Sequence, residues 1–322
     1  MKRRSVAVFA LLFLAISASA FAQRNSSRPP TPTASAPTAD DSKVDLAYGA
    51  YQRGYYLTAL REATKRAQQN DPAAMTLLGE IYSQGLGVPR DDNKAAQWYK
   101  LAASRGDAHA LFALAMFAFQ GRAGAPNPEE GTRLLTEAAK LGLPVAAYDL
   151  GLLYLDGHQV PQDFGRAAQL FRTAADAGNP EAQYALATLY KEGRGVPKDP
   201  AQAARLLGAA SVAGNLDAMV EYAIAQFNGD GVPKNESAAA QLFLRAARRG
   251  SPIAQDRLAR ILMAGRGMPA NPVEAVKWHL IAQAGGSSDP ELDVFASKQS
   301  KDVRDAAERA ARKWLATATP RS

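Results

Sequence analysis

The chain has 322 residues, 47% of them hydrophobic and 21% charged, with a formal net charge of +7 at pH 7. It contains no cysteine, which excludes disulfide bonds, thiolate chemistry and lipid attachment to a cysteine. Three of its basic residues lie at positions 2–4. Without these three residues the formal charge falls from +7 to +4, so the remaining chain would be only mildly basic.

The first 22 residues have the layout of a cleaved secretory signal. Basic residues at positions 2–4 precede an apolar run at 6–16, and the small residues Ala20 and Ala22 stand just before Gln23. The apolar run is too short for a permanent membrane span. We expect cleavage near Ala22 and a location in the bacterial periplasm, or beyond it.

Residues 23–42 are mainly Pro, Ser, Thr and Ala, with no large apolar side chain. Such a stretch cannot bury enough surface to offset the entropy of ordering, so it is predicted to be a disordered linker. Residues 43–70 then carry spaced alanines and tyrosines around Gly54 and look like a shortened tetratricopeptide hairpin. Terminal units of a repeat array are atypical, so this segment is predicted to cap the array at its N-terminal end.

A repeat of constant length occupies residues 71–286. Six blocks of 36 residues follow one another without insertion or deletion. The blocks begin at Asp71, Asp107, Leu143, Asn179, Asn215 and Ser251. A fixed period of this size indicates a stacked array of small units.

Each block is predicted to be a helical hairpin. Counting from 1 to 36, position 1 is Asp, Asn or Ser in five blocks and position 2 is Pro in four, which is typical of a helix start. Position 15 is Gly in all six blocks and suits a helix end, while position 21 is always Asp or Asn and begins a second helix. Apolar residues at 25, 28, 29, 32 and 33 give the second helix one buried face.

A single hairpin has too few apolar anchors to fold alone, so neighbouring hairpins must supply the remaining burial. Alanine at positions 4 and 32 and a small residue at position 9 are expected to let adjacent hairpins approach closely. Beyond Gly286 the register slips, and helices starting at Asp289 and near Lys301 are predicted to form a C-terminal cap over residues 287–318.

Three elements of the block carry a family resemblance: the loop G-x-G-V-P-x-D, the first helix A-x-x-x-L-G and the second helix A-x-x-W-Y-x-x-A-A. Together they resemble the Sel-one-like repeat (SLR) family, which is related to tetratricopeptide repeats. The resemblance implies an all-α fold, a right-handed α/α solenoid, that acts as a protein-interaction scaffold and not as an enzyme. The second block (loop 121–127) and the third (Gln159 in place of Gly) depart from the loop pattern.

Residues that could carry chemistry are sparse. His109, His158 and His279 lie in different blocks, so their spacing predicts no metal site, and no common hydrolase motif is present. The paired loop glycines join two helices and are predicted to be turns, not a phosphate cradle. We therefore expect no enzymatic activity and no cofactor. The competing hypotheses are an envelope hydrolase acting on cell-wall or β-lactam substrates, as linked to cysteine-rich members of the resembled family, and a purely structural spacer.

One candidate binding surface is apolar. Aromatic residues recur at position 6 of three successive blocks, and positions 10 and 13 add further apolar side chains. This set, the apolar stripe, consists of Phe112, Met116, Phe119, Tyr148, Leu152, Leu155 and Tyr184. Such a stripe would bind an extended or helical peptide. The alternative is that its side chains pack between hairpins.

A second candidate is basic. Residues 241–281 contain seven basic and two acidic residues. The proposed basic patch consists of Arg245, Arg248, Arg249, Arg257 and Arg260. It would suit an acidic partner or an anionic polymer of the envelope. The alternative is a solvated surface, because Arg248 and Arg249 end a helix and complement its dipole. The expected partner is a protein or peptide of the envelope, with no nucleic acid and no membrane span after signal cleavage.

Overall fold

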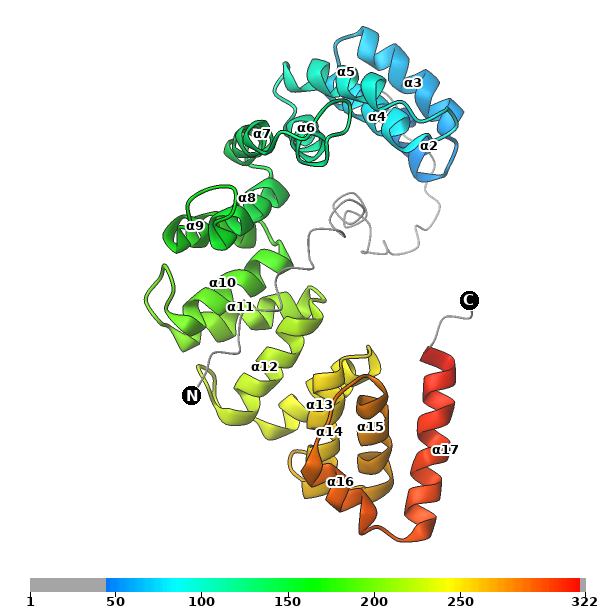
Figure 1. Ribbon diagram of the computed structural model, residues 1–322, viewed down its shortest axis with the longest axis vertical. Coiled ribbons are helices and arrows are strands. Elements are labelled where there is room, and N and C mark those ends of the chain that lie inside the picture. The colour runs from blue at the N-terminus through cyan, green and yellow to red at the C-terminus, as the bar shows by residue number, and fades with distance from the viewer. Residues whose placement is uncertain (1–44, 319–322) are drawn as a thin grey trace, which may run out of the picture. The chain divides into compact units, whose positions relative to one another are not determined.

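The computed structural model describes residues 45–318, and every regular element in that range is an α-helix. The predicted all-α class is confirmed for these residues, whereas the predicted signal (1–22) and linker (23–42) lie outside them. The helices (Figure 1) are α2 (Leu46–Gln52), α3 (Tyr56–Gln68), α4 (Pro72–Gln84), α5 (Asp92–Ala103), α6 (Ala108–Gln120), α7 (Pro128–Lys140), α8 (Pro144–Asp156), α9 (Phe164–Asp176), α10 (Pro180–Glu192), α11 (Pro200–Val212), α12 (Leu216–Asn228), α13 (Glu236–Arg248), α14 (Pro252–Ala264), α15 (Pro272–Ala284), α16 (Pro290–Ser297) and α17 (Lys301–Ala318).

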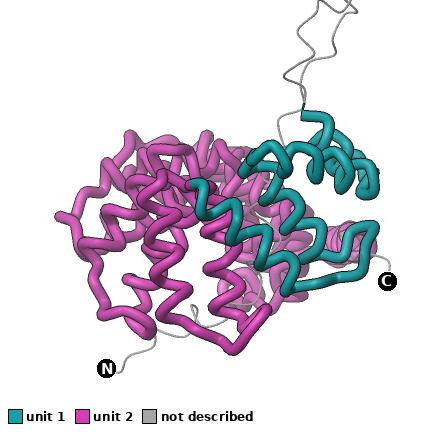
Figure 2. Tube along the Cα trace, turned by 90° about the horizontal axis from the view of Figure 1, so that it is seen from above, with its two compact units in different colours: residues 1–105 teal, residues 106–322 magenta. Residues whose placement is uncertain are grey.

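The chain divides into two compact units, residues 1–105 and 106–322 (Figure 2). In the described part of the first unit, α2 packs on α3, α3 on α4 and α4 on α5. In the second unit each helix from α6 to α15 packs on the next, and α17 packs on α15. The second unit is therefore a linear stack of hairpins. None of the helices in residues 45–318 combines the length and the apolar character that a membrane crossing requires.

Side chains at the block boundaries explain where the helices begin and end. The Asp71 carboxylate accepts a hydrogen bond of 3.0 Å from the Ala73 amide, and Asn179 caps α10 in the same way through the Ala182 amide. Leu143, the exception in the sequence pattern, makes no side-chain cap. Gly85 ends α4 with φ of 71°, the left-handed conformation that closes a helix.

A small residue at position 9 makes room for a large one at position 29 of the same hairpin. A Cβ atom on Gly79 would lie 2.4 Å from the Tyr99 ring, and one on Gly151 would lie 2.6 Å from the Phe171 ring. Tyr99 and Phe171 are among the largest fully buried side chains of the described residues. The expectation that glycine at position 9 serves the approach of adjacent hairpins is wrong, because these glycines lie against a ring within their own hairpin.

The loop glycine at position 17 makes the close contact between repeats instead. A Cβ atom on Gly231 would lie 2.0 Å from the Pro200 carbonyl oxygen, at the start of the preceding repeat's second helix. A Cβ atom on Gly195 or Gly267 would lie 2.2 Å from the corresponding carbonyl oxygen of the preceding repeat. The two deviant loops differ from each other: Ala123 keeps the left-handed conformation with φ of 59°, whereas Gln159 is not among the residues with positive φ.

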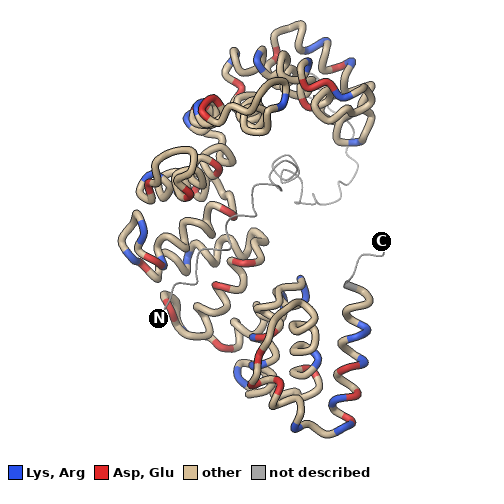
Figure 3. The backbone as a smooth tube through the Cα atoms, in the orientation of Figure 1, with Lys and Arg blue, Asp and Glu red and all other residues tan. Residues whose placement is uncertain are grey.

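The C-terminal helices cover the last repeat of the second unit. Ala307 and Ala311 of α17 are buried, and the Trp314 ring lies 5.9 Å from the Trp278 ring in an edge-on arrangement. Leu292 of α16 is also buried. Charged residues of both signs occur along α17 (Figure 3), and Glu308, Arg309, Arg312 and Lys313 are exposed, so this helix has one face for the stack and one for solvent.

Candidate partner-binding face

The apolar stripe falls on the first helices of three successive repeats, α6, α8 and α10, and all seven of its side chains are half-buried. Tyr148 lies 5.7 Å, ring to ring, from Phe171 of its own hairpin. Phe119 lies over Gly131 of α7, where an added Cβ would be only 2.7 Å from its ring. The stripe therefore packs on the hairpins with one side of its rings and offers the other to solvent.

The structure brings part of the stripe together. Tyr148, Leu152, Leu155 and Tyr184 all pack against one core cluster formed by residues of α8 to α12. The ring of Phe119 belongs to the neighbouring hairpin α6–α7. The stripe is thus continuous from α8 to α10, and its role in binding stays a prediction.

Carboxylates stand beside the two tyrosines of the stripe, and sequence reasoning missed them. Burial, with smaller contributions from the charges of Asp149 and Glu181, raises the pKa of the Tyr148 phenol to about 12. Burial likewise raises the pKa of the Tyr184 phenol to about 12, with added contributions from Glu221 and Asp217.

The pKa of each phenol is thus raised in part by a carboxylate on the first helix of the next repeat. We call the set Tyr148, Asp149, Glu181, Tyr184, Asp217 and Glu221 the acidic tyrosine face. Acidic residues recur along α8, α10 and α12 (Figure 3). The sequence signal was available, because positions 3 and 7 of the block share a helical face with positions 6 and 10.

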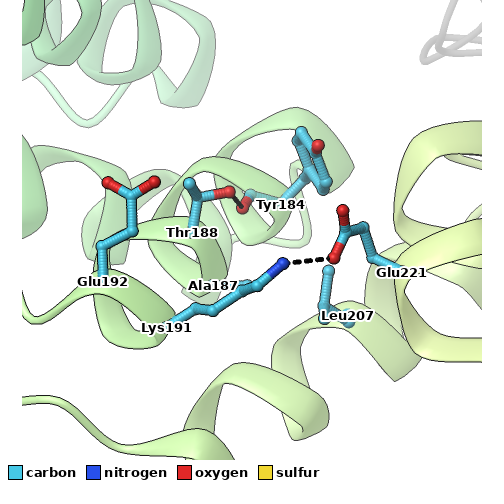
Figure 4. A pocket seen from close by; sticks show the side chains of 7 residues that line it. All are labelled: Tyr184, Ala187, Thr188, Lys191, Glu192, Leu207 and Glu221. Carbon is cyan, nitrogen blue, oxygen red and sulfur yellow. Dashed lines mark hydrogen bonds and ion pairs between the residues drawn. The ribbon is translucent and has the colours of Figure 1, made fainter. Parts of the chain in front are cut away.

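A pocket of about 160 Å³ opens beside Tyr184 between α10, α11 and α12 (Figure 4). The side chains that line it are Tyr184, Ala187, Thr188, Lys191, Glu192, Leu207 and Glu221. The Lys191 ammonium lies 2.6 Å from the Glu221 carboxylate and links α10 to α12. The pocket thus combines apolar walls with one ion pair.

Asp149 is the unusual member of the acidic tyrosine face. Its side chain is only 8% exposed, and its Oδ2 has no hydrogen-bond partner among the described residues. Burial raises the pKa of this carboxyl to about 7. An unsatisfied carboxyl oxygen in such a place costs folding free energy.

The basic patch is smaller than the sequence indicates. The Arg260 guanidinium pairs with Asp289 at 2.6 Å and with Glu291 at 2.5 Å, which fastens α14 to the C-terminal helix α16. Arg249 donates to the Gly214 carbonyl oxygen at 2.9 Å. The remaining three arginines are exposed and have no ion-pair partner within residues 45–318: Arg245, Arg248 and Arg257. Binding of an acidic partner by these three stays a prediction.

The three histidines lie in three different repeats. His158 is exposed and contacts Asp156, while His279 is buried and its Nε2 lies 2.8 Å from Asp293 of α16. Among the residues that the structure describes, no three His, Cys, Asp or Glu side chains are grouped so as to hold a metal ion. His279 occupies position 29, where the other repeats place a large core residue, so its geometry is that of a core side chain bonded to the cap.

Helical hairpins that stack on one another from repeat to repeat define an α-solenoid. The Sel1 repeat model matches residues 72–107, 108–143, 144–179, 180–215, 216–251 and 252–287. The chain belongs to the Sel1 repeat family. Proteins of this family serve as protein–protein interaction scaffolds and are typically not catalytic.

Solved structures agree with this fold. A Sel1 repeat protein of Oxalobacter formigenes is 27% identical with a TM-score of 0.62, over 76% of this chain and 96% of that one. A protective antigen of uropathogenic Escherichia coli with the SLR fold is 24% identical with a TM-score of 0.53, over 84% of this chain and 67% of that one. The second likeness concerns the fold alone.

A curated relative is similar over a short stretch. Chitin synthase regulatory factor 3 of Schizosaccharomyces pombe is 31% identical over 93 residues, which are 29% of this chain. The match spans only 10% of that relative's length. It therefore indicates a shared repeat and carries no information on the role of that whole protein.

Proposed function

We propose that this protein is an exported scaffold that holds a partner protein of the bacterial envelope on the first helices of its second unit. One observation carries the proposal: seven apolar side chains on α6, α8 and α10 are neither fully buried nor dispersed, but half-exposed on successive repeats. Tyrosines and other aromatic side chains of this kind are the usual anchors of protein interfaces.

The proposed location rests on the sequence of residues 1–22, with its basic start, apolar run and small residues before Gln23. Expression of the full chain in a Gram-negative host, followed by cell fractionation and N-terminal sequencing of the product, tests it. We expect the product in the periplasmic fraction with Gln23 as its first residue. A full-length product in the cytoplasm would contradict export.

Capture from solubilised envelope tests the scaffold role. The bait is the chain itself, compared with Tyr148→Ala/Tyr184→Ala, which removes both tyrosines of the stripe. We expect the double variant to lose at least about tenfold of the captured partner, because aromatic anchors contribute most of an interface's affinity.

The chain provides a matched control on the same two helices. Tyr154 and Tyr190 are also half-buried, but they lie at position 12 and engage Arg166 at 3.1 Å and Arg172 at 2.6 Å. The variant Tyr154→Ala/Tyr190→Ala should capture the partner as the unchanged chain does. If Tyr148→Ala/Tyr184→Ala loses helicity, or melts at a much lower temperature than this control, the stripe residues belong to the hydrophobic core. The assignment of partner binding to this face would then be wrong.

A further inference from the structure

We infer that a groove along α11 binds an amphipathic helix of a partner protein, which places apolar side chains in the groove and acidic side chains beside them. The inference goes beyond the proposed function, because this groove lies on a second helix of a repeat, whereas the apolar stripe lies on first helices. Three observations carry it: the lining of the groove, the way in which the chain covers the equivalent surface of α15, and the unpaired arginines at the groove.

The α11 groove has a volume of about 710 Å³, and its lining includes Tyr222 of α12 and Val232 of the loop that follows. The residues of α11 that line it are Ala201, Ala204, Arg205, Gly208, Ala209 and Val212. Val212 is 87% exposed, more than any other large apolar side chain among the described residues. Since a cavity of about 150 Å³ holds a benzene ring, the groove has room for about four side chains, as many as two turns of an amphipathic helix present on one face.

The surface of α11 at the groove is uncharged where most second helices carry charge. It includes repeat positions 23, 30, 31 and 34, and in α5, α7, α9 and α13 at least one of these four residues is charged. Only two of the six second helices have no charge there: α11 with Ala201, Gly208, Ala209 and Val212, and α15 with Val273, Leu280, Ile281 and Ala284.

In α15 the chain covers this surface with a helix of its own. The helix α17 packs on α15 (Figure 1), and Ile281 at position 31 is only 2% exposed, in one core cluster with Ala311 and Trp314 of α17. At position 31 of the other five second helices the side chain is half-buried or exposed, and Ala209 is exposed. The protein thus covers one such surface with an amphipathic helix, and no helix of residues 45–318 occupies the α11 groove.

Arginines at the groove specify the polar side of the incoming helix. Arg205 lines the groove. Arg245 and Arg248 stand on α13 at the repeat positions that Ala209 and Val212 have on α11, so they extend from the next second helix in the same direction. The three arginines are exposed and have no ion-pair partner within residues 45–318, and none of the residues that line the groove is acidic. Acidic side chains of a partner helix would form charge-assisted hydrogen bonds with them.

Fluorescence anisotropy with two labelled peptides tests the inference on the full chain. Both peptides are about 16 residues long and rich in alanine, because shorter isolated helices are marginally stable in water. Both carry leucine at i, i+3, i+4 and i+7, and the flanking positions are Glu in one peptide and Lys in the other. We expect the Glu/Leu peptide to bind and the Lys/Leu peptide to bind at least about tenfold more weakly. Equal or tighter binding of the Lys/Leu peptide would overturn the inference.

A neutral double variant locates the binding. Ala209→Gln/Val212→Gln makes the groove polar, and the control Leu141→Gln/Ala177→Gln also replaces one alanine and one large apolar residue, both exposed, in the same unit. The groove variant should bind the Glu/Leu peptide at least about fivefold more weakly, whereas the control stays within about twofold. Circular dichroism melting checks that both remain folded. Equal losses in the two variants, or none in either, would contradict the inference.

A basic triple variant tests the charge. Arg205→Gln/Arg245→Gln/Arg248→Gln should remove most of the preference for the Glu/Leu peptide over the Lys/Leu peptide, because the cations that distinguish the two are gone. The control Lys140→Gln/Lys298→Gln/Arg309→Gln neutralises three other exposed basic residues and should keep the preference. A preference that both triple variants keep, or that both lose, would show that these arginines do not select the helix.

The stripe variant separates this inference from the proposed function. Tyr148→Ala/Tyr184→Ala should bind the Glu/Leu peptide as the unchanged chain does, because neither tyrosine lines the groove. Loss in the stripe variant with retention in Ala209→Gln/Val212→Gln would move helix binding to the stripe, which supports the proposed function and overturns the inference. Light scattering tests for a second copy as the occupant: a dimer that Ala209→Gln/Val212→Gln dissociates would also overturn it.

Discussion

At the scale of single residues, the loop of the second repeat holds a strained alanine. Ala123 has φ of 59°, where four other repeats place glycine at the same position. A side chain in this left-handed conformation costs about 1 kcal/mol or more. Ala123→Gly should therefore raise the free energy of unfolding by about 0.5 to 1 kcal/mol, after allowing for the greater entropy of glycine in the unfolded chain.

Urea unfolding followed by circular dichroism measures this gain. The control is Ala125→Gly in the same exposed loop, since Ala125 is not among the residues with positive φ. That change should lower stability slightly, because glycine only adds unfolded-state entropy there. A gain in both variants, or in neither, would show that the conformation of Ala123 is not a source of strain.

Asp149 makes stability depend on pH in a defined direction. Burial raises the pKa of its carboxyl to about 7 in the folded chain, above the value of 3.8 that is ordinary for aspartate. Between these two pKa values the folded chain therefore holds a proton on Asp149 that the unfolded chain has released. The protonated carboxyl contributes its full stabilisation below about pH 4. This stabilisation falls as the pH rises and is lost completely above about pH 7.

The variant Asp149→Asn isolates this effect. Its stability relative to the unchanged chain should grow from about pH 4 to about pH 7 by about 2 to 4 kcal/mol, since each pH unit is worth about 1.4 kcal/mol, and then level off. Urea unfolding at a series of pH values provides the measurement, with Asp176→Asn as the exposed control that changes stability little. A difference that is constant with pH would mean that Asp149 is not buried as a neutral acid.

At the scale of elements, each loop fastens its hairpin to the one before. Gly231 shows this most sharply, because a Cβ atom there would lie 2.0 Å from the Pro200 carbonyl oxygen. Gly231→Ala must therefore move the loop off the preceding repeat, and we expect a loss of more than about 2 kcal/mol in unfolding free energy. Thermal and urea unfolding would record the change.

Gly229 separates the contact from the backbone strain. It also has a left-handed conformation, with φ of 88°, but its added Cβ would lie 3.3 Å from the nearest atom, the Cβ of Lys234, and so would need a shift of only a few tenths of an ångström. Gly229→Ala should therefore cost about 1 to 2 kcal/mol, mainly from backbone strain. Equal effects of the two substitutions would show that the loop contact between repeats contributes nothing.

The sequence predicted the elements well because their signals are local. Asp71 as a cap, Gly85 as a helix end and the paired faces of each hairpin follow from chemistry within a few residues, and the structure has each of them. Contacts between distant residues were harder. The partners of Gly79 and Gly231, and the neighbours that leave Asp149 unsatisfied, depend on packing that periodicity does not encode.

The candidate site divides along the same line. The repeat positions of Tyr148 and Tyr184 are visible in the sequence, and so is their recurrence. Their half-burial, and the approach of Glu181 and Asp217 from the next repeat, arise only when hairpins are stacked. The ion pairs of Arg260 could not be predicted for the same reason, because Asp289 and Glu291 lie beyond residues 241–281, over which the charges were counted.

At the scale of the second unit as a whole, the last hairpin of a linear array has no following repeat to cover its apolar face. The helix α17 covers this face at the C-terminal end by burying Ala307 and Ala311 and by placing Trp314 edge-on to Trp278 of α15. Repeats that contact only their neighbours depend on such caps for solubility. The proposed scaffold role likewise requires that this end of the stack does not associate with other copies of the chain.

Removing residues 301–322 should therefore expose the apolar side of α15 and lead to self-association. We expect a lower melting temperature and a concentration-dependent increase in mass by light scattering. The variant Trp314→Ala keeps α17 but removes half of the ring pair, and should cost about 1 to 3 kcal/mol without self-association, because a partly exposed ring loses less than a buried one. A truncated chain that stays monomeric and melts as the unchanged chain does would show that α17 is not the cap of this array.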